Sequence, residues 1–164
     1  VSQLEVLPQP TAEAALDELQ AFYTLSVDRM KSRCTPCQVR RFVELARAYP
    51  AVEEVQAKAC WALRNIAHWG GSSGCDAVIA GDGLWVIFTA MDTFTESEDV
   101  QKDAFSALCW LAEKGSASES VKSAIVSGGG EARLRRALAG GAGMATFALQ
   151  SLGLEVPLPV SVLC

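Results

Sequence analysis

The stretch KACWALRNIAHW, residues 58–69, is rich in alanine and apolar side chains, yet it holds a tryptophan and an asparagine four positions apart. On a helix, residues four apart share one face, so Trp61 and Asn65 are expected to lie together. Asparagine is a poor helix former and a poor core residue. The pair therefore indicates a helix face that serves something other than core packing.

A similar pattern returns 45 positions later in the chain. VQAKACWALRNIAHW starts at Val55, and VQKDAFSALCWLAEK starts at Val100. The apolar residues that the two stretches share are spaced by three and four, as in the buried stripe of an amphipathic helix. Self-similarity at such a period is the signature of repeat architectures. The stripe residues predicted to face the core are Val55, Ala59, Ala62, Leu63 and Ile66.

Other segments extend this repeat into a unit of three helices. AVIAGDGLWVIFTAM (77–91) parallels SAIVSGGGEARLRRAL (123–138), since each has a short apolar segment, a glycine turn and a new helix. GMATFALQSLG (143–153) is a fainter third copy, and VRRFVELARAYP (39–50) fits the helix before Val55. The predicted helices lie near 13–31, 37–48, 52–69, 75–80, 84–93, 98–114, 119–126, 131–138 and 143–153.

Turn and cap residues punctuate these helices. In TESE (95–98), Thr95 is predicted to cap a long helix, with Glu98 three residues on. GDG (81–83) and GGG (128–130) predict sharp turns. Glycines before a helix also suggest a phosphate cradle, but GGG lacks the Gly-Lys-Ser/Thr ending of a P-loop and occupies the place of GDG, which favours the turn.

Length, charge and composition narrow the function classes. The chain has 164 residues, half of them hydrophobic, which suits one globular domain. The net charge is −5, and no basic stripe is present, so nucleic acid is not an expected partner. No apolar run reaches the roughly 18 residues needed to cross a bilayer, so no membrane partner is expected. We predict an N-terminal extension at 1–13, a repeat domain at 14–153 and an extended C-terminal tail at 154–164.

The chain ends and the cysteines give two further expectations. The first residue is Val rather than Met, so we expect the chain to be part of something longer, without a signal segment. Six cysteines in a chain of this length do not form a dense disulfide framework. We therefore expect a reducing compartment, the cytoplasm or the nucleus.

Three-helix units at this period resemble the armadillo repeat family, over roughly residues 37–153 and best over 55–91. The resemblance implies an all-α fold, a right-handed α-solenoid of armadillo-type repeats whose third helices line a concave groove. It also implies a non-enzymatic scaffold or adaptor, without a cofactor, that binds a protein or an extended peptide in that groove.

Trp61 and Asn65 also match the WALxNIA pattern of importin-alpha third helices, which bind nuclear-localisation peptides. An amide offers a donor and an acceptor to an extended peptide backbone, and an indole offers an apolar wall and a cation–π surface. The pair is not repeated as a ladder, because Trp61 is followed by Ser106 and Phe147 at the equivalent positions. Arg64 is also expected to repel a basic peptide, so a nuclear-import adaptor is disfavoured.

The predicted binding residues each have a simpler alternative role. Asn65 is about equally explained by a local hydrogen bond, and Trp61 by packing between repeats. The residues that we predict to bind protein or peptide are Trp61, Arg64, Asn65, Trp110, Glu113 and Phe147.

Two alternatives to a peptide-binding scaffold remain. Cys34 and Cys37 form a Cys-x-x-Cys at a predicted helix start, where a lowered thiol pKa suits thiol exchange or half of a metal site. The candidate extra ligands His68 and Cys75 lie in another repeat, so we predict neither zinc nor a disulfide there. The second alternative is a self-association module, because a short repeat array leaves apolar end faces uncapped.

Overall fold

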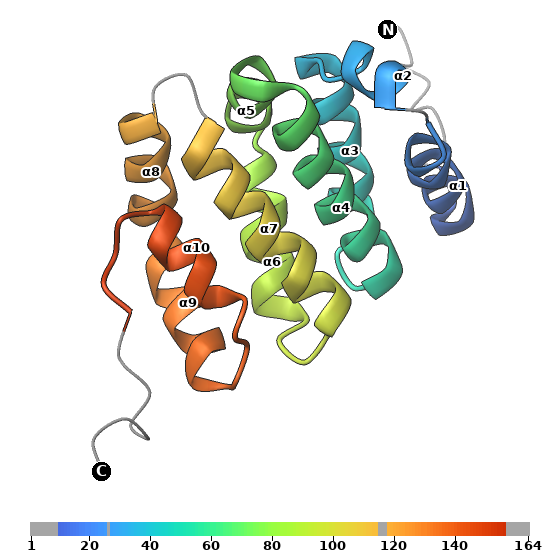
Figure 1. Cartoon of the computed structure of the whole chain (residues 1–164). Coiled ribbons are helices and arrows are strands. Elements are labelled where there is room, and N and C mark those ends of the chain that lie inside the picture. Colours follow the sequence, from blue (N-terminus) through green and yellow to red (C-terminus); the bar gives the residue numbers. More distant parts are fainter. Residues whose placement is uncertain (1–9, 26, 115–117, 157–164) are drawn as a thin grey trace, which may run out of the picture.

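The computed structural model describes residues 10–25, 27–114 and 118–156, and every regular element within these ranges is an α-helix (Figure 1). The all-α prediction is therefore confirmed. The helices are α1 (Ala12–Tyr23), α2 (Val27–Ser32), α3 (Pro36–Ala48), α4 (Glu53–Trp69), α5 (Gly71–Ala80), α6 (Gly83–Thr93), α7 (Glu98–Lys114), α8 (Ser118–Ser127), α9 (Gly130–Ala139) and α10 (Ala145–Ser151).

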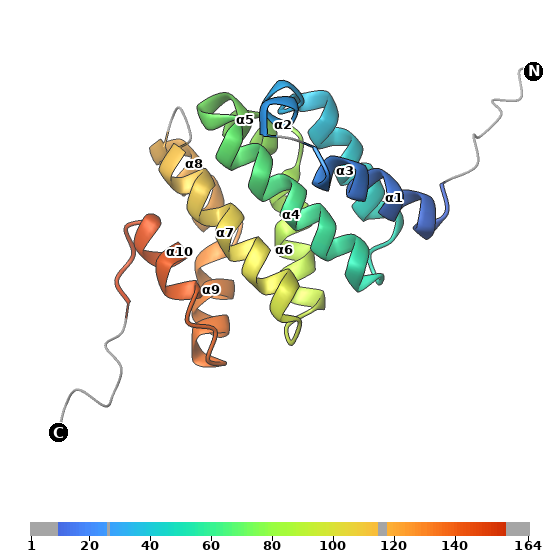
Figure 2. The same ribbon diagram turned by 45° about the vertical axis from the view of Figure 1, so that its right-hand side comes forward.

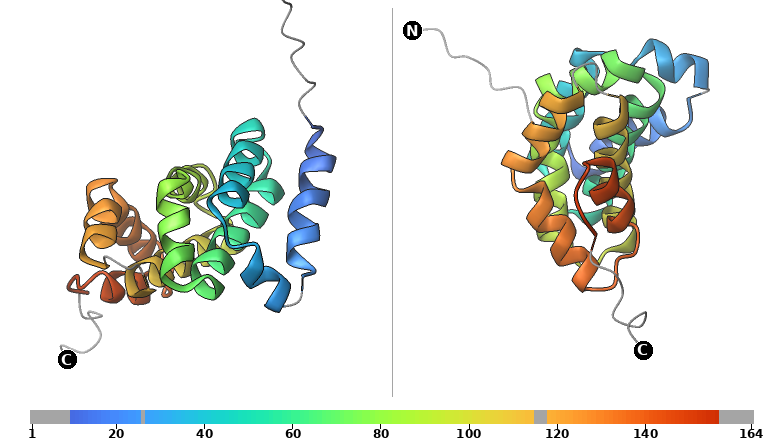
Figure 3. Two further views of the ribbon diagram at one scale, coloured as in Figure 1. Left: turned by 90° about the horizontal axis from the view of Figure 1, so that it is seen from above. Right: turned by 60° about the vertical axis from the view of Figure 1, so that its left-hand side comes forward.

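Seven of the described helices form two neighbouring rows (Figures 1 and 2). Helices α1, α4, α7 and α10 lie side by side in what we call the front row, and α3, α6 and α9 lie behind them. Helices α2, α5 and α8 each lead from a front-row helix to the next helix of the second row. Seen from above, α1 and α10 lie at opposite ends of the assembly (Figure 3).

The 45-residue repeat of the sequence corresponds to two equivalent helices of the structure. Helices α4 and α7 each have 17 residues and begin 45 positions apart, at Glu53 and Glu98. The predicted core stripe is confirmed, because all of its side chains are fully buried. These are Val55, Ala59, Ala62, Leu63 and Ile66, each with 0% exposure.

A buried glutamine in the first turn of each long helix repeats the same hydrogen bonds. Gln56 Nε2 donates to the carbonyl oxygens of Ala46 (2.8 Å) and Tyr49 (3.0 Å), which lie at the end of α3. These bonds tie the start of α4 to the helix before it. At the equivalent positions, Gln101 Nε2 donates to the carbonyl oxygens of Met91 (3.0 Å) and Phe94 (2.9 Å).

Replacing Gln56 or Gln101 by leucine is expected to lower the free energy of unfolding by about 1–2 kcal/mol at each position, because two carbonyl oxygens lose a donor in a buried site. The cost stays modest because both carbonyls beside Gln56 also accept backbone N–H groups. Urea denaturation of each variant measures the change. The exposed Gln150→Leu is the matched control, and a loss as large in that variant would contradict the assignment.

The two glycine turns have the predicted conformation. Asp82 and Gly129 both adopt left-handed backbone angles, with φ of 62° and 83°, and each directly precedes a helix. A Cβ on the following residue, Gly83, would lie 2.6 Å from Val78 Cγ1. The glycine is therefore needed for the close approach of α5 and α6.

The predicted helix over 13–31 is wrong, because the structure has two helices there, α1 and α2. Helix α1 ends at Tyr23, and the Thr24 hydroxyl donates to the Ala21 carbonyl oxygen at 3.0 Å. A threonine side chain bonded to the preceding turn competes with continuation of the helix. The direction of the chain then changes before α2, although the apolar pattern continues.

One helix cap and two helix starts also differ from the prediction. Helix α5 begins at Gly71, four residues before the predicted range 75–80. The cap of α7 is Ser97 rather than Thr95, because Ser97 Oγ accepts the backbone N–H of Val100 at 3.4 Å. Helix α10 spans Ala145–Ser151, within the longer predicted range 143–153. The predicted tail is described only for 154–156, which have no regular structure, and residues 157–164 lie outside the described residues.

None of the described helices is by itself long and apolar enough to cross a membrane. Helices α5 and α6 meet that length and composition only as a pair, which is bent by 72° at its break.

Candidate functional site

Two hollows open on the front row, and together their linings contain most of the predicted binding residues. The hollow between α1, α4 and α7, here the α4 hollow, has a volume of about 500 Å³. The hollow between α7 and α10, here the α10 hollow, has a volume of about 490 Å³. The α4 hollow is lined by Tyr23, Glu54, Ala57, Lys58, Trp61, Arg64, Asp99, Lys102 and Asp103. The α10 hollow is lined by Ser106, Cys109, Trp110, Glu113, Phe147, Gln150 and Ser151.

Trp61 lines the α4 hollow and also helps to hold α1 in place. Its ring lies 4.3 Å from that of Tyr23 and 6.2 Å from that of Phe22, both on α1. The Arg64 guanidinium lies 5.7 Å from the same indole ring. The alternative of packing between repeats is therefore at least partly realised, and Trp61 contributes only its remaining exposed surface to the hollow.

Arg64 lines the α4 hollow as one half of an ion pair. Its Nη1 lies 2.5 Å from Oδ1 of Asp103 on α7, and the two side chains are 25% and 9% exposed. Burial raises the pKa of Asp103, and the guanidinium of Arg64 acts in the opposite direction. The positive charge of Arg64 is therefore balanced within the protein, where it joins α4 to α7. The expectation that Arg64 repels a basic peptide assumes an unpaired charge, and the ion pair with Asp103 corrects that assumption.

Asn65 lies outside both hollows. The residue is buried, with 7% exposure, and its Nδ2 donates to the Trp61 carbonyl oxygen at 2.7 Å within α4. The geometry thus supports the local hydrogen bond, not the amide presented to a peptide backbone.

The remaining three predicted residues meet in the α10 hollow. Trp110 and Glu113 come from α7, and Phe147 comes from α10. Phe147 is 63% exposed, the largest exposure among the described large apolar side chains. The Glu113 carboxylate is held by Ser151, whose Oγ donates to Oε1 at 2.8 Å.

An aromatic cluster beside the α10 hollow was not predicted. The His68 ring lies 4.3 Å from that of Trp69 and 4.1 Å from that of Trp110, so it joins the ends of α4 and α7. The Lys114 ammonium lies 4.5 Å from the Trp110 ring centroid and donates to the His68 carbonyl oxygen at 3.4 Å. Burial, followed by the charges of Lys114 and Arg64, lowers the pKa of His68. The lowered pKa favours the neutral form of His68, whose ring packs between Trp69 and Trp110.

The Cys-x-x-Cys segment lies at the start of α3 and holds two free thiols. Thr35 caps the helix, and its Oγ1 accepts the Gln38 N–H at 3.3 Å. Cys34 Sγ donates to the Met30 carbonyl oxygen at 3.2 Å. Burial raises the pKa of Cys34, whereas the thiol-exchange alternative expects a lowered pKa. Within the described ranges, no three His, Cys, Asp or Glu side chains gather as a metal site.

The cysteines are expected to react with N-ethylmaleimide in an order set by burial. Cys37 is exposed and should react first. Cys75 is buried, and burial raises its pKa to about 11 from 9.0, so at pH 7.5 it holds about a hundredfold less thiolate than an ordinary cysteine. Mass spectrometry after a short pulse of reagent reads the order. Labelling of Cys75 as early as Cys37 in the native protein would contradict the packing of α5.

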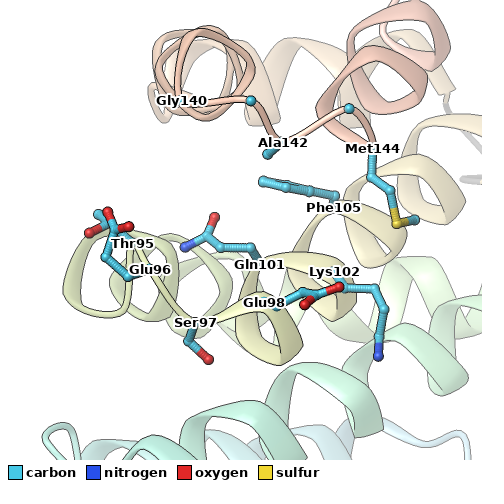
Figure 4. A pocket seen from close by; sticks show the side chains of 12 residues that line it. Thr95, Glu96, Ser97, Glu98, Gln101, Lys102, Phe105, Gly140, Ala142 and Met144 are labelled. Atoms are coloured by element: carbon cyan, nitrogen blue, oxygen red, sulfur yellow. The ribbon is translucent and has the colours of Figure 1, made fainter.

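A third hollow, of about 380 Å³, lies near the N-terminal end of α7 (Figure 4). Phe105 lies opposite the loop that contains Ala142 and Met144. The six predicted binding residues are not part of its lining. The candidate functional site is therefore the pair of hollows on the front row.

Comparisons with known proteins do not assign a family. Neither family models nor curated proteins match the sequence, and no solved structure matches the fold.

Proposed function

We propose that the protein is an armadillo-type α-solenoid that acts as a non-enzymatic scaffold and binds an extended segment of a partner protein along its front row. The repeated glutamine bonds and the 45-residue offset of α4 and α7 support the solenoid. Repeats of this kind stack neighbour on neighbour and create extended binding surfaces. The cytoplasm or the nucleus remains the expected location.

The observation that carries the proposal is the composition of the two hollows. They gather aromatic side chains that are unusual on a protein surface, above all Tyr23 at 51% exposure and Phe147 at 63%. Exposed aromatic groups in a depression are typical anchoring points of protein interfaces. Five of the six predicted residues contribute to these linings, namely Trp61, Arg64, Trp110, Glu113 and Phe147.

The spacing of the front row suits an extended chain. Packed helices lie about 8–10 Å apart, and an extended chain advances about 3.3 Å per residue. One front-row helix therefore corresponds to about three residues of a bound segment. A segment that spans the two to three helix spacings covered by the α4 hollow and the α10 hollow would need about five to nine residues by the same distances.

Selection from a phage-displayed library of random 12-residue peptides tests this proposal. We expect enriched peptides to bind the wild type and to lose about 30-fold or more in affinity to the variant Trp110→Ala/Phe147→Ala, because each truncated anchor costs about 1–2 kcal/mol or more at an interface. Trp61 is left unchanged because it contacts α1. Trp110 also contacts His68, so thermal unfolding of the variant is measured in parallel to show that the fold is kept.

The matched control is Trp85→Ala. Trp85 is a partly exposed tryptophan of the second row, 40% exposed, with the Arg47 guanidinium 4.8 Å from its ring centroid. Binding that survives the front-row variant but disappears with Trp85→Ala would refute the proposal, as would a library without any enriched peptide. Sedimentation of the peptide-free protein tests the self-association alternative in the same preparation.

A further inference from the structure

The two hollows differ in whether the carboxylates of their linings form ion pairs. In the α4 hollow every carboxylate has a cation: Glu54 pairs with Lys58 at 3.8 Å, Asp99 with Lys102 at 3.2 Å, and Asp103 with Arg64. The lining of the α10 hollow contains one charged residue, Glu113. The described residues offer Glu113 a hydroxyl partner, Ser151, but no ion pair. Among the residues that the structure describes, the negative charge of the α10 hollow therefore has no ion-pair partner.

Two aromatic side chains line the same hollow as this carboxylate. Trp110 and Phe147 come from neighbouring helices, and among the described ring contacts none joins these two rings. The Trp110 indole already accepts one ammonium, that of Lys114, at 4.5 Å from its centroid. Lys114 does not line the hollow, because its Nζ is directed to the His68 carbonyl oxygen on α4. An aromatic face and a carboxylate together are the groups that recognise a cationic side chain.

We propose that the α10 hollow binds a lysine or arginine side chain of the bound segment, with its alkyl stem between Trp110 and Phe147 and its charged end at Glu113. This inference rests on the proposed function, and it adds the chemistry of the partner. Ser151 acts as a positioning residue, since its hydrogen bond fixes the Glu113 carboxylate at the edge of the hollow. The α4 hollow, with its charges balanced, has no such preference.

The test uses peptides from the selection described above and measures their affinities by fluorescence anisotropy. We expect the enriched peptides to share one basic residue. Replacing that residue by norleucine should weaken binding about tenfold or more, and Glu113→Gln should weaken the original peptide by a similar factor. The two changes together should cost little more than either alone, because both remove the same interaction.

The matched control is Glu44→Gln on α3, an exposed carboxylate of the second row that lines neither hollow, where we expect less than a threefold change in affinity. Glu113→Lys should restore binding of a peptide whose basic residue is replaced by glutamate. The inference is overturned if Glu113→Gln binds the original peptide as well as the wild type does, or if the enriched peptides lack a basic residue. If the affinity of those peptides still falls in the variant Trp110→Ala/Phe147→Ala, the proposed function stands and only the inference about a basic side chain fails.

Discussion

Replacing Leu63 by alanine is expected to lower the free energy of unfolding by about 2–5 kcal/mol, the usual cost of truncating a buried leucine. Leu63 has 0% exposure, and its Cδ2 lies 3.4 Å from the position that a Cβ on Gly83 would occupy. The side chain thus fills the space between α4 and the start of α6. Because Leu63 is fully buried, its truncation removes the whole side chain from core contacts, and we expect the loss in the upper part of this range. Urea denaturation followed by circular dichroism at 222 nm measures it.

The control for this change is Leu138→Ala on α9. Leu138 is only partly buried, so its truncation removes less apolar surface from the core. We expect a loss of about 1 kcal/mol, in proportion to the smaller buried area. Equal losses at Leu63 and Leu138 would show that the stripe of α4 is not the centre of the core.

Replacing Gly83 by alanine is expected to cost about 2–3 kcal/mol, because inserting a methyl group into a closely packed site forces backbone shifts. The new Cβ would lie 2.8 Å from the Val78 carbonyl oxygen, a backbone atom with little freedom to move. Gly130 occupies the equivalent turn, where a Cβ would lie 2.7 Å from the Ile125 carbonyl oxygen. Gly130→Ala should therefore cost a similar amount. Thermal and urea unfolding of both variants check this equivalence.

Gly143→Ala is the matched control, since a Cβ there meets no atom within 4 Å and the backbone has no positive φ. At such a site, alanine reduces the entropy of the unfolded chain and is expected to change stability by less than about 1 kcal/mol. A tolerated Gly83→Ala would contradict the close approach of α5 and α6.

Much of the helical framework could be predicted because the repeat makes the chain its own comparison. The predicted ranges 52–69 and 98–114 agree with α4 and α7, since the same stripe of alanine and leucine fixes both helices. The break between α1 and α2 was missed because the apolar pattern continues through Thr24. A change of chain direction there depends on local hydrogen bonds, which an apolar period does not encode.

The candidate site could be predicted only in part. A residue that lies off the buried stripe of a helix must face away from the core. This rule predicts that Trp61, Trp110 and Phe147 face a binding surface, and all three line one of the two hollows. The apolar pattern of one helix does not predict which side chains pair across two helices. Arg64 and Asp103 are 39 positions apart, and their ion pair depends on how α4 and α7 pack. The bond from Asn65 to the Trp61 carbonyl is one of the two roles that the sequence allows for this amide, because asparagine often bonds to nearby backbone.

The central claim is that a partner segment lies along the front row, and the four tryptophan indoles offer a direct test of it. The measurement is a titration of the ¹⁵N-labelled protein with a library-selected peptide, followed by the indole N–H resonances in two-dimensional NMR spectra. The account predicts that Trp61 and Trp110, which line the two hollows, shift with saturation, whereas Trp85 on the second row stays in place. Shifts at Trp85, with Trp61 and Trp110 unchanged, would contradict it.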